Sequence, residues 1–206
     1  MIALDLAFLM IFHPTDAYYE IKRRGKSLSI IPAVLIFLLV IVVRYVYVLF
    51  VHVPMADIKL QDTNAVLEVA RILLPVLTVI VSIYAVTAVL YGETKLRTIF
   101  ITVAYSFLPY IIIMPLLLLV SQVTALTEGQ YYFGVQGIMW AWIVLLVFFS
   151  IMRQNDYSFK KTVGVTLLSL IGVVLIWAVA IMILALSVQI VAWFQEVIKE
   201  YVVFNL

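Results

Sequence analysis

Five long apolar stretches constrain the fold of this chain more than any other feature of the sequence. They cover residues 28–51, 72–90, 99–125, 135–151 and 163–187. A helix needs about 20 apolar residues to cross about 30 Å of hydrocarbon. In lipid, a spanning segment must satisfy its backbone amides internally, which a helix does. The sequence therefore predicts an all-α polytopic membrane protein, built as a bundle of five transmembrane helices.

Composition supports this class and limits the domain organisation. The chain has 206 residues, of which 67% are hydrophobic and 12% are charged, whereas soluble domains have about 45–50% apolar and about 25% charged residues. No polar stretch leaves room for a separate soluble catalytic domain. We expect an interfacial segment at residues 1–27 and a transmembrane domain at residues 28–206. The absence of cysteine excludes disulfides and thiolate chemistry, and a net charge of +2 gives no indication of nucleic-acid binding.

The positions of the basic residues predict the orientation in the membrane. Cytoplasmic loops of membrane proteins carry an excess of Lys and Arg. Alternate connections of this chain place nine basic residues on one side. We therefore expect a multi-pass protein of the plasma membrane with a cytoplasmic N-terminus and an extracytoplasmic C-terminus. The nine residues are Lys22, Arg23, Arg24, Lys26, Lys95, Arg97, Arg153, Lys160 and Lys161.

The stretch "HPTDAYYEIKRRGKS" is typical of a short amphipathic helix. Thr15 or Asp16 can cap its N-terminus, and Gly25 can end it in a left-handed conformation. Its apolar face includes Tyr18. We expect this helix to lie on the cytoplasmic membrane surface, where basic residues interact with anionic lipids. Its basic patch acts either only as a topology signal or as a docking surface for a cytoplasmic partner, and comprises Lys22, Arg23, Arg24 and Lys26.

The C-terminal stretch "VQIVAWFQEVIKEYVVFNL" also shows a helical apolar face. It either extends the fifth span beyond the outer surface or folds onto that surface.

The residues that catalysis or metal binding would need are missing from the spans. The only histidines, His13 and His52, fall on opposite sides of the predicted membrane. No H-E-x-x-H, G-x-S-x-G or glycine-rich phosphate loop occurs in the sequence. We therefore expect no catalytic, cofactor or metal site and no enzymatic activity.

Arg44 is the single charge inside a predicted span. It either extends toward the outer interface or pairs with an acidic residue. The candidates for that partner are Asp57, Asp62 and Glu68. Since Glu68 lies three residues before Arg71, these two should form a local pair on one helical face.

The third span contains two prolines, in "TVAYSFLPYIIIMP". Pro109 and Pro115 each remove one helical hydrogen bond, and hydroxyls of neighbouring residues can compensate for this in lipid. We therefore predict a bent third span that packs against other spans or, alternatively, lines a pore. Small residues also allow helices to approach closely. The candidate packing or partner positions are Tyr105, Ser106, Pro109, Pro115, Ala88, Gly92 and Gly172.

The segment "AYSFLP" resembles the aromatic-Ser-x-x-Pro signature of the Yip-type family, integral membrane proteins named for interaction with Ypt/Rab GTPases. The opening "FHPTDAYYEIKRRGKSLSIIPAVLIFLL" resembles the bacterial branch, with "TDAYYE" in place of the Asp-Leu-Tyr-Gly-Pro element of eukaryotic members. The resemblance implies five spans. It also implies an association with carbohydrate ABC importers, since bacterial members are often encoded beside their permeases.

These observations lead to one hypothesis and two alternatives. The favoured hypothesis is an accessory or scaffold subunit whose partners are membrane lipids and other integral membrane subunits, such as ABC importer permeases. One alternative is a membrane-organising or trafficking-type protein that acts through its N-terminal helix. The other is a small facilitator or channel, whose polar residues should converge on one lumen. The candidates for that lining are Thr87, Thr102, Tyr105, Ser106, Thr166 and Ser169.

Overall fold

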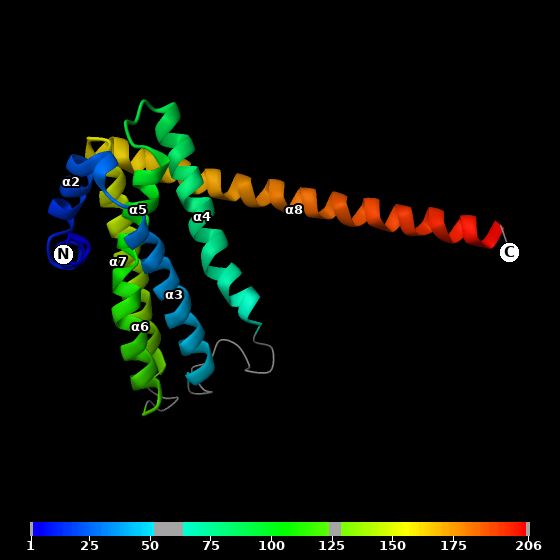
Figure 1. Cartoon of the computed structure of the whole chain (residues 1–206), viewed down its shortest axis with the longest axis horizontal. Coiled ribbons are helices and arrows are strands. Elements are labelled where there is room, and N and C mark those ends of the chain that lie inside the picture. The colour runs from blue at the N-terminus through cyan, green and yellow to red at the C-terminus, as the bar shows by residue number, and fades with distance from the viewer. Residues whose placement is uncertain (1, 52–63, 124–128, 205–206) are drawn as a thin grey trace.

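The computed structural model describes residues 2–51, 64–123 and 129–204, and all regular elements in these ranges are helices (Figure 1). Five helical segments are long and apolar enough to cross a membrane: α3, α4, α5 together with α6, α7, and α8. The predicted fold class is thus confirmed. The elements are α1 (Ile2–Phe12), α2 (Pro14–Arg24), the 3-10 turn η1 (Gly25–Ser27), α3 (Ile31–Phe50), α4 (Ala65–Val89), α5 (Leu96–Ser106), α6 (Leu108–Ser121), α7 (Gly129–Gln154) and α8 (Phe159–Phe204).

The second span begins earlier than its apolar stretch indicated. Helix α4 starts at Ala65 rather than at residue 72. The side chain of Asn64 caps it by accepting a hydrogen bond of 2.9 Å from the backbone N–H of Val66. Hydropathy alone places the start of the span after Glu68 and Arg71. These two charges neutralise each other within the helix, which can therefore begin before them.

The third span is interrupted next to Pro109, consistent with the predicted bend, but not at Pro115. Helix α5 ends at Ser106, Phe107 lies outside the helical region with φ −86° and ψ 1°, and α6 begins at Leu108. Pro109 occupies the first turn of α6, where its missing N–H costs no helical hydrogen bond. Pro115 lies inside α6, and the helix continues through it.

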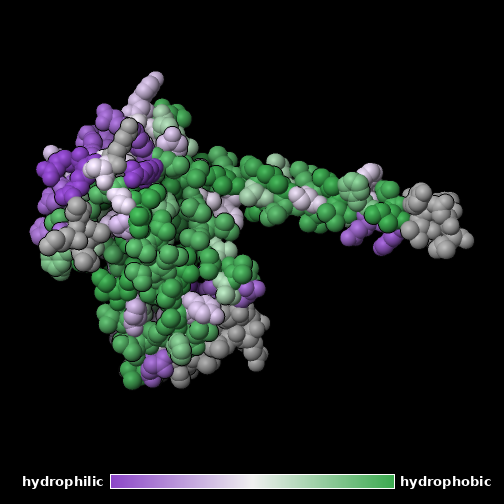
Figure 2. Space-filling view, viewed as in Figure 1, coloured by the Kyte–Doolittle hydropathy of each residue, from purple (hydrophilic) through white to green (hydrophobic). Residues whose placement is uncertain are grey.

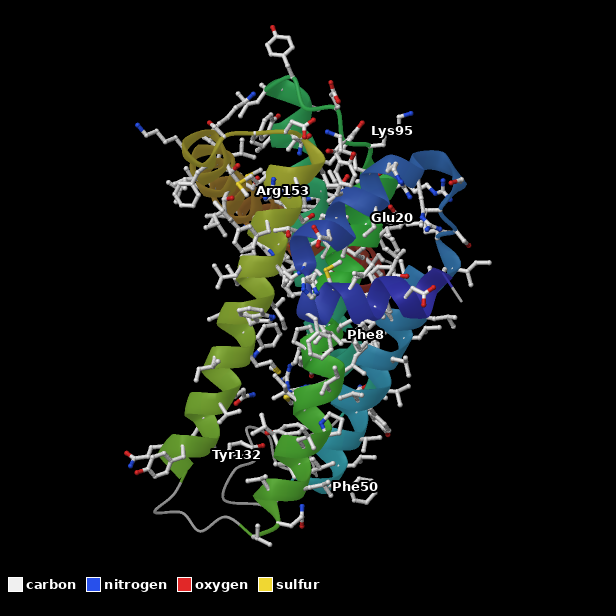
Figure 3. The ribbon with its side chains drawn as sticks, turned by 90° about the vertical axis from the view of Figure 1, so that its left-hand side faces the viewer. Phe8, Glu20, Phe50, Lys95, Tyr132 and Arg153 are labelled. Atoms are coloured by element: carbon white, nitrogen blue, oxygen red, sulfur yellow. The ribbon has the colours of Figure 1, made fainter. Side chains whose placement is uncertain are left out.

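Helices α3, α4 and α7 run alongside the third span, in which α5 and α6 follow one another end to end (Figures 1 and 3). The bundle has two chemically different ends. Glu20, Lys95 and Arg153 lie at one end, whereas Phe50 and Tyr132 lie at the other (Figure 3). We call these the basic end and the far end. Hydrophilic surface gathers at the basic end, and hydrophobic surface covers the length of the bundle (Figure 2).

The N-terminal segment forms two helices that join the bundle. Helix α2 follows the predicted bounds, and Gly25 ends it with φ 48°. The predicted capping by Thr15 or Asp16 is wrong, because the helix starts at Pro14 with His13 at the N-cap position and no side-chain cap bond. The predicted apolar face of α2 packs against α5 and α7, and Leu6 and Met10 of α1 join the same core.

Helix α8 is a single helix of 46 residues. Its first turns pack against α4 and α7, and the rest extends away from the bundle (Figure 1). Only 6% of the most apolar 18-residue stretch of α8 is buried inside the protein, compared with 28–50% of the corresponding stretches in the other spans. The C-terminal stretch therefore continues residues 163–187 as one helix, which runs crosswise to α3–α7 (Figure 1).

Candidate functional site

A buried hydroxyl cluster joins α2 to the break in the third span. Tyr18 of α2 is fully buried. Its hydroxyl lies 2.9 Å from Ser106 Oγ, at the last residue of α5. The same hydroxyl lies 2.8 Å from the carbonyl oxygen of Leu146 in α7 and can donate to it. Ser106 Oγ can also donate to the carbonyl of Thr102 at 2.8 Å. One tyrosine thus connects three helices at the basic end.

The proton count of this cluster allows two directions of hydrogen bonding. Tyr18 and Ser106 each have one hydroxyl proton, and these two protons serve three contacts. Ser106 can donate to Tyr18 while Tyr18 donates to Leu146, or Tyr18 can donate to Ser106 while Ser106 donates to Thr102. Burial raises the pKa of the Tyr18 phenol above its ordinary range, and the bond to Ser106 opposes this shift only in part. The phenol therefore keeps its proton at neutral pH and remains a donor.

Two further contacts fasten α2 to the end of α7. Gln154 Nε2 donates to the backbone carbonyl of Tyr18 at 3.1 Å in a buried position. The ammonium of Lys22 forms an ion pair with Asp156, just past the end of α7. These contacts hold α2 against the bundle, so protein contacts position this helix.

The basic patch of α2 is partly paired within the helix. Arg24 Nε lies 2.6 Å and Arg23 Nη2 lies 2.9 Å from carboxylate oxygens of Glu20. Hydrogen bonds from Arg24 and then Arg23 lower the pKa of Glu20 below its ordinary value. The side chain of Lys26 lies outside the described residues.

The connection between α4 and α5 is held by the turn between α7 and α8. Thr94 donates to Asn155 Oδ1 from its backbone N–H at 3.2 Å and from its hydroxyl at 2.7 Å. A Cβ at Gly92 would lie 2.6 Å from Asn155 Oδ1, 2.8 Å from the Tyr157 hydroxyl and 2.9 Å from the carbonyl of Thr87. Gly92 therefore allows a close approach, which a larger residue would prevent.

Four of the six hydroxyls proposed to line a channel bind carbonyls of their own helices, those of Thr87, Thr102, Ser106 and Ser169. The buried Thr166 hydroxyl has no hydrogen-bond partner among the described residues. Thr87 donates to Ile83 at 2.8 Å, and Ser169 donates to Val165 at 2.8 Å. Thr102 likewise reaches the carbonyl of Ile99 at 3.0 Å. Of the six candidates, only Thr166 and Ser169 line the large groove between α4 and α7. The structure does not bring these polar residues together into one lumen.

A buried charge cluster lies near the far end of α3 and α4. Arg44 Nε lies 3.0 Å from one carboxylate oxygen of Glu68, and Arg71 Nη1 lies 2.6 Å from the other. The Glu68 side chain is 3% exposed and that of Arg44 is 16% exposed. Arg44 therefore pairs across helices rather than only extending to the interface. Asp57 and Asp62, its other candidate partners, lie outside the described residues.

The proposed packing positions separate into buried and exposed ones. Tyr105, Ser106 and Pro109 are buried at the break. Gly172 lies against Ser82, whose hydroxyl donates to the carbonyl of Ser169 at 2.6 Å. Two positions are exposed: Ala88 and Pro115.

The sequence-based reasoning missed several residues that hold this end together. The predicted site residues did not include Gln154, Asn155 or Tyr157, although all three are buried. Their only signal was the polar turn between two apolar stretches. Among the described residues, no group of three or more His, Cys, Asp or Glu side chains could hold a metal ion. The arrangement is suited to fixing the positions of the helices.

Replacing Tyr18 with phenylalanine should loosen α2 while leaving the spans in place. The variant keeps the buried ring but loses the hydroxyl contacts, and a net hydrogen bond contributes about 0.5–1.5 kcal/mol. We expect tryptic cleavage after Lys22, Arg23 or Arg24 to become up to about tenfold faster, because local opening exposes these sites. Tyr19→Phe is the matched control, since Tyr19 is 66% exposed. Equal cleavage rates for the two variants would contradict a docking role for the hydroxyl.

Comparisons with known proteins agree with the architecture. A family model described as the Yip1 domain matches residues 8–182. This range contains α2, the break at Phe107 and the first turns of α8. No curated protein and no solved structure matches the chain.

Proposed function

The chain belongs to the Yip1 domain family of membrane proteins, and we propose that it works as a non-enzymatic accessory or scaffold subunit of a larger membrane complex. The partner class that we propose is the permease subunits of a bacterial carbohydrate ABC importer in the plasma membrane. That choice rests on the resemblance to bacterial members encoded beside such permeases, which is an association and not a mechanism. The N-terminus would be cytoplasmic and the C-terminus extracytoplasmic.

The observation that carries the proposal is the uncovered length of α8. In the structure α8 leaves the basic end crosswise to α3–α7 (Figure 1), so the proposal requires α8 to turn relative to the bundle when it crosses the membrane. If residues 163–187 then span the bilayer, the helix continues about 25 Å beyond it at 1.5 Å per residue. This extension has an apolar side that is exposed in the structure. Lipid tails can cover the membrane section, but an apolar strip outside the bilayer needs a protein or a membrane surface against it. The exposed residues are Ile190, Trp193, Phe194, Val197 and Ile198.

The membrane section of α8 also has features of a helix-packing surface. Ala178 and Ala185 lie seven residues apart on one face, and both are exposed. Helices in lipid associate through close packing of small residues. We propose that this face contacts the permease within the bilayer while the extension contacts it outside.

Partner retention tests the proposal directly. The full chain, purified in mild detergent from its native membrane, should keep the permease subunits during a wash at about 1 M salt, since packing in the bilayer is not screened as exposed ion pairs are. Replacing Ala178 and Ala185 together with phenylalanine should reduce the recovered permease by about tenfold or more. Ile183→Phe, on the opposite face, should leave recovery unchanged.

Two results would contradict the proposal. Loss of the permease at about 1 M but not at about 0.1 M salt would place the contact on the basic end instead. Recovery of the chain without any permease subunit, from membranes that contain the importer, would reject the accessory role.

A further inference from the structure

A long apolar groove runs between α4 and α7. Residues of α5, α6 and α8 complete its walls, and its volume is about 500 Å³. Along α7 it extends from Gln136 to Ile151, which is about 22 Å of helix. Aliphatic and aromatic side chains line most of it, among them Val79, Val103, Phe107, Trp140 and Val144.

One end of the groove carries a positive charge. Arg44 and Arg71 line it there, and both bind the carboxylate of Glu68. Two guanidinium groups face one carboxylate, so this described cluster has a net charge of +1. The Arg71 side chain is 53% exposed, which leaves its guanidinium accessible from the groove. Gln136 adds a polar side chain to the lining.

The lining of the groove favours a small amphipathic ligand. The volume and the lining of the groove match those of small-molecule sites, which are mostly apolar and hold a few polar groups that orient the ligand. A single flexible hydrocarbon chain with one anionic group has the required shape and charge.

We propose that this groove binds one anionic phospholipid, with its phosphate at Arg71 and one acyl chain along the groove toward α8. Guanidinium groups form paired, charge-assisted hydrogen bonds with phosphate oxygens. Arg71 lies about 9 Å along α4 from its first residue, and its long side chain can extend toward the headgroup level of the bilayer. The lipid would neutralise the excess charge and fill the apolar space between α4 and α7.

Native mass spectrometry of the full chain in detergent tests the charge requirement. The probes are phosphatidylglycerol, which is anionic, and phosphatidylcholine, which is zwitterionic, with matched acyl chains. We expect one phosphatidylglycerol to bind about tenfold more tightly than phosphatidylcholine. Arg71→Gln should abolish this preference without unfolding the chain, because Arg44 still pairs with Glu68. Lys160→Gln, at an exposed position of the basic end, should retain the preference.

A second measurement locates the bound lipid. Phosphatidylglycerol with a photoactivatable acyl chain should label peptides of α4 and α7 that line the groove. Val144→Trp should block this labelling, since Val144 lines the groove and is 61% exposed. Ile112→Trp, at an exposed position of α6, should leave it unchanged.

Three outcomes would overturn the proposal. One is equal binding of the two lipids to the unmodified chain. Another is an equal loss of preference in Arg71→Gln and Lys160→Gln. The third is cross-linking that joins groove residues to α8 of a second copy, which would show that protein occupies the space.

Discussion

Replacing Glu68 with glutamine should destabilise the protein by about 3–5 kcal/mol, the range expected when a buried ion pair loses one partner. Glu68 is the only acidic partner of both Arg44 and Arg71 among the described ion pairs. The variant leaves two guanidinium groups close together in an apolar surrounding, with one of them largely buried. Thermal unfolding in detergent, followed by far-UV circular dichroism, should show a decrease in Tm on the order of 10 °C.

The matched control for this variant is Glu93→Gln, because Glu93 is exposed at the basic end. The double change of Arg44 and Glu68 to methionine should recover much of the lost stability, since it removes the two buried charges together and leaves only Arg71, whose side chain is 53% exposed. Similar Tm values for Glu68→Gln and Glu93→Gln would show that the cluster does not stabilise the bundle.

Gly172→Leu should weaken the attachment of α8 to α4. A Cβ at this position would lie closer to Ser82 Oγ than van der Waals contact allows, and it would lie 3.5 Å from Ser82 Cβ. The serine must move and lose its bond to the carbonyl of Ser169, so the cost combines overpacking of about 1–3 kcal/mol with a lost hydrogen bond of about 1 kcal/mol. We expect a Tm decrease of several degrees, on the order of 5–15 °C.

Gly164→Leu is the control, because nothing lies within 4 Å of the position that its Cβ would occupy. The clash also predicts a specific compensation. Gly172→Ala should be destabilising in the unmodified chain but tolerated together with Ser82→Ala, which removes the hydroxyl and leaves an ordinary contact between methyl groups. If Ser82→Ala fails to relieve Gly172→Ala, the close approach of α4 and α8 is not the cause of the loss.

Local signals in the sequence were enough to predict the spans and the break. Pro109 has no backbone N–H for a helical hydrogen bond and so favours the first turn of a helix, and the structure places the break two residues before it, at Phe107. Gly25 ends α2 with a positive φ for an equally local reason. The same reasoning failed at the start of α4, where a hydropathy average treats Glu68 and Arg71 as costs and cannot include their mutual neutralisation.

The contacts between helices were not predictable in this way. Tyr18 and Ser106 are separated by 88 positions, and nothing near either residue indicates the other. Ala88 and Pro115 illustrate a second difficulty. A helix that is apolar on all sides gives no sign of which side faces protein and which faces lipid, so residues that seemed suited to packing are exposed.

The unbroken course of α8 has a mechanical consequence. The helix is about 69 Å long at 1.5 Å per residue, and only its first turns are anchored to the bundle. Such a rod fixes both the reach and the rotational phase of its tip. One added residue would turn everything beyond it by about 100°, whereas seven would nearly restore the original phase and lengthen the rod by about 10 Å. A surface that contacts Trp193 and Phe194 is therefore held at a fixed rotation about the helix axis relative to Gly172, which packs against Ser82 of α4. The backbone of α8 alone makes this connection.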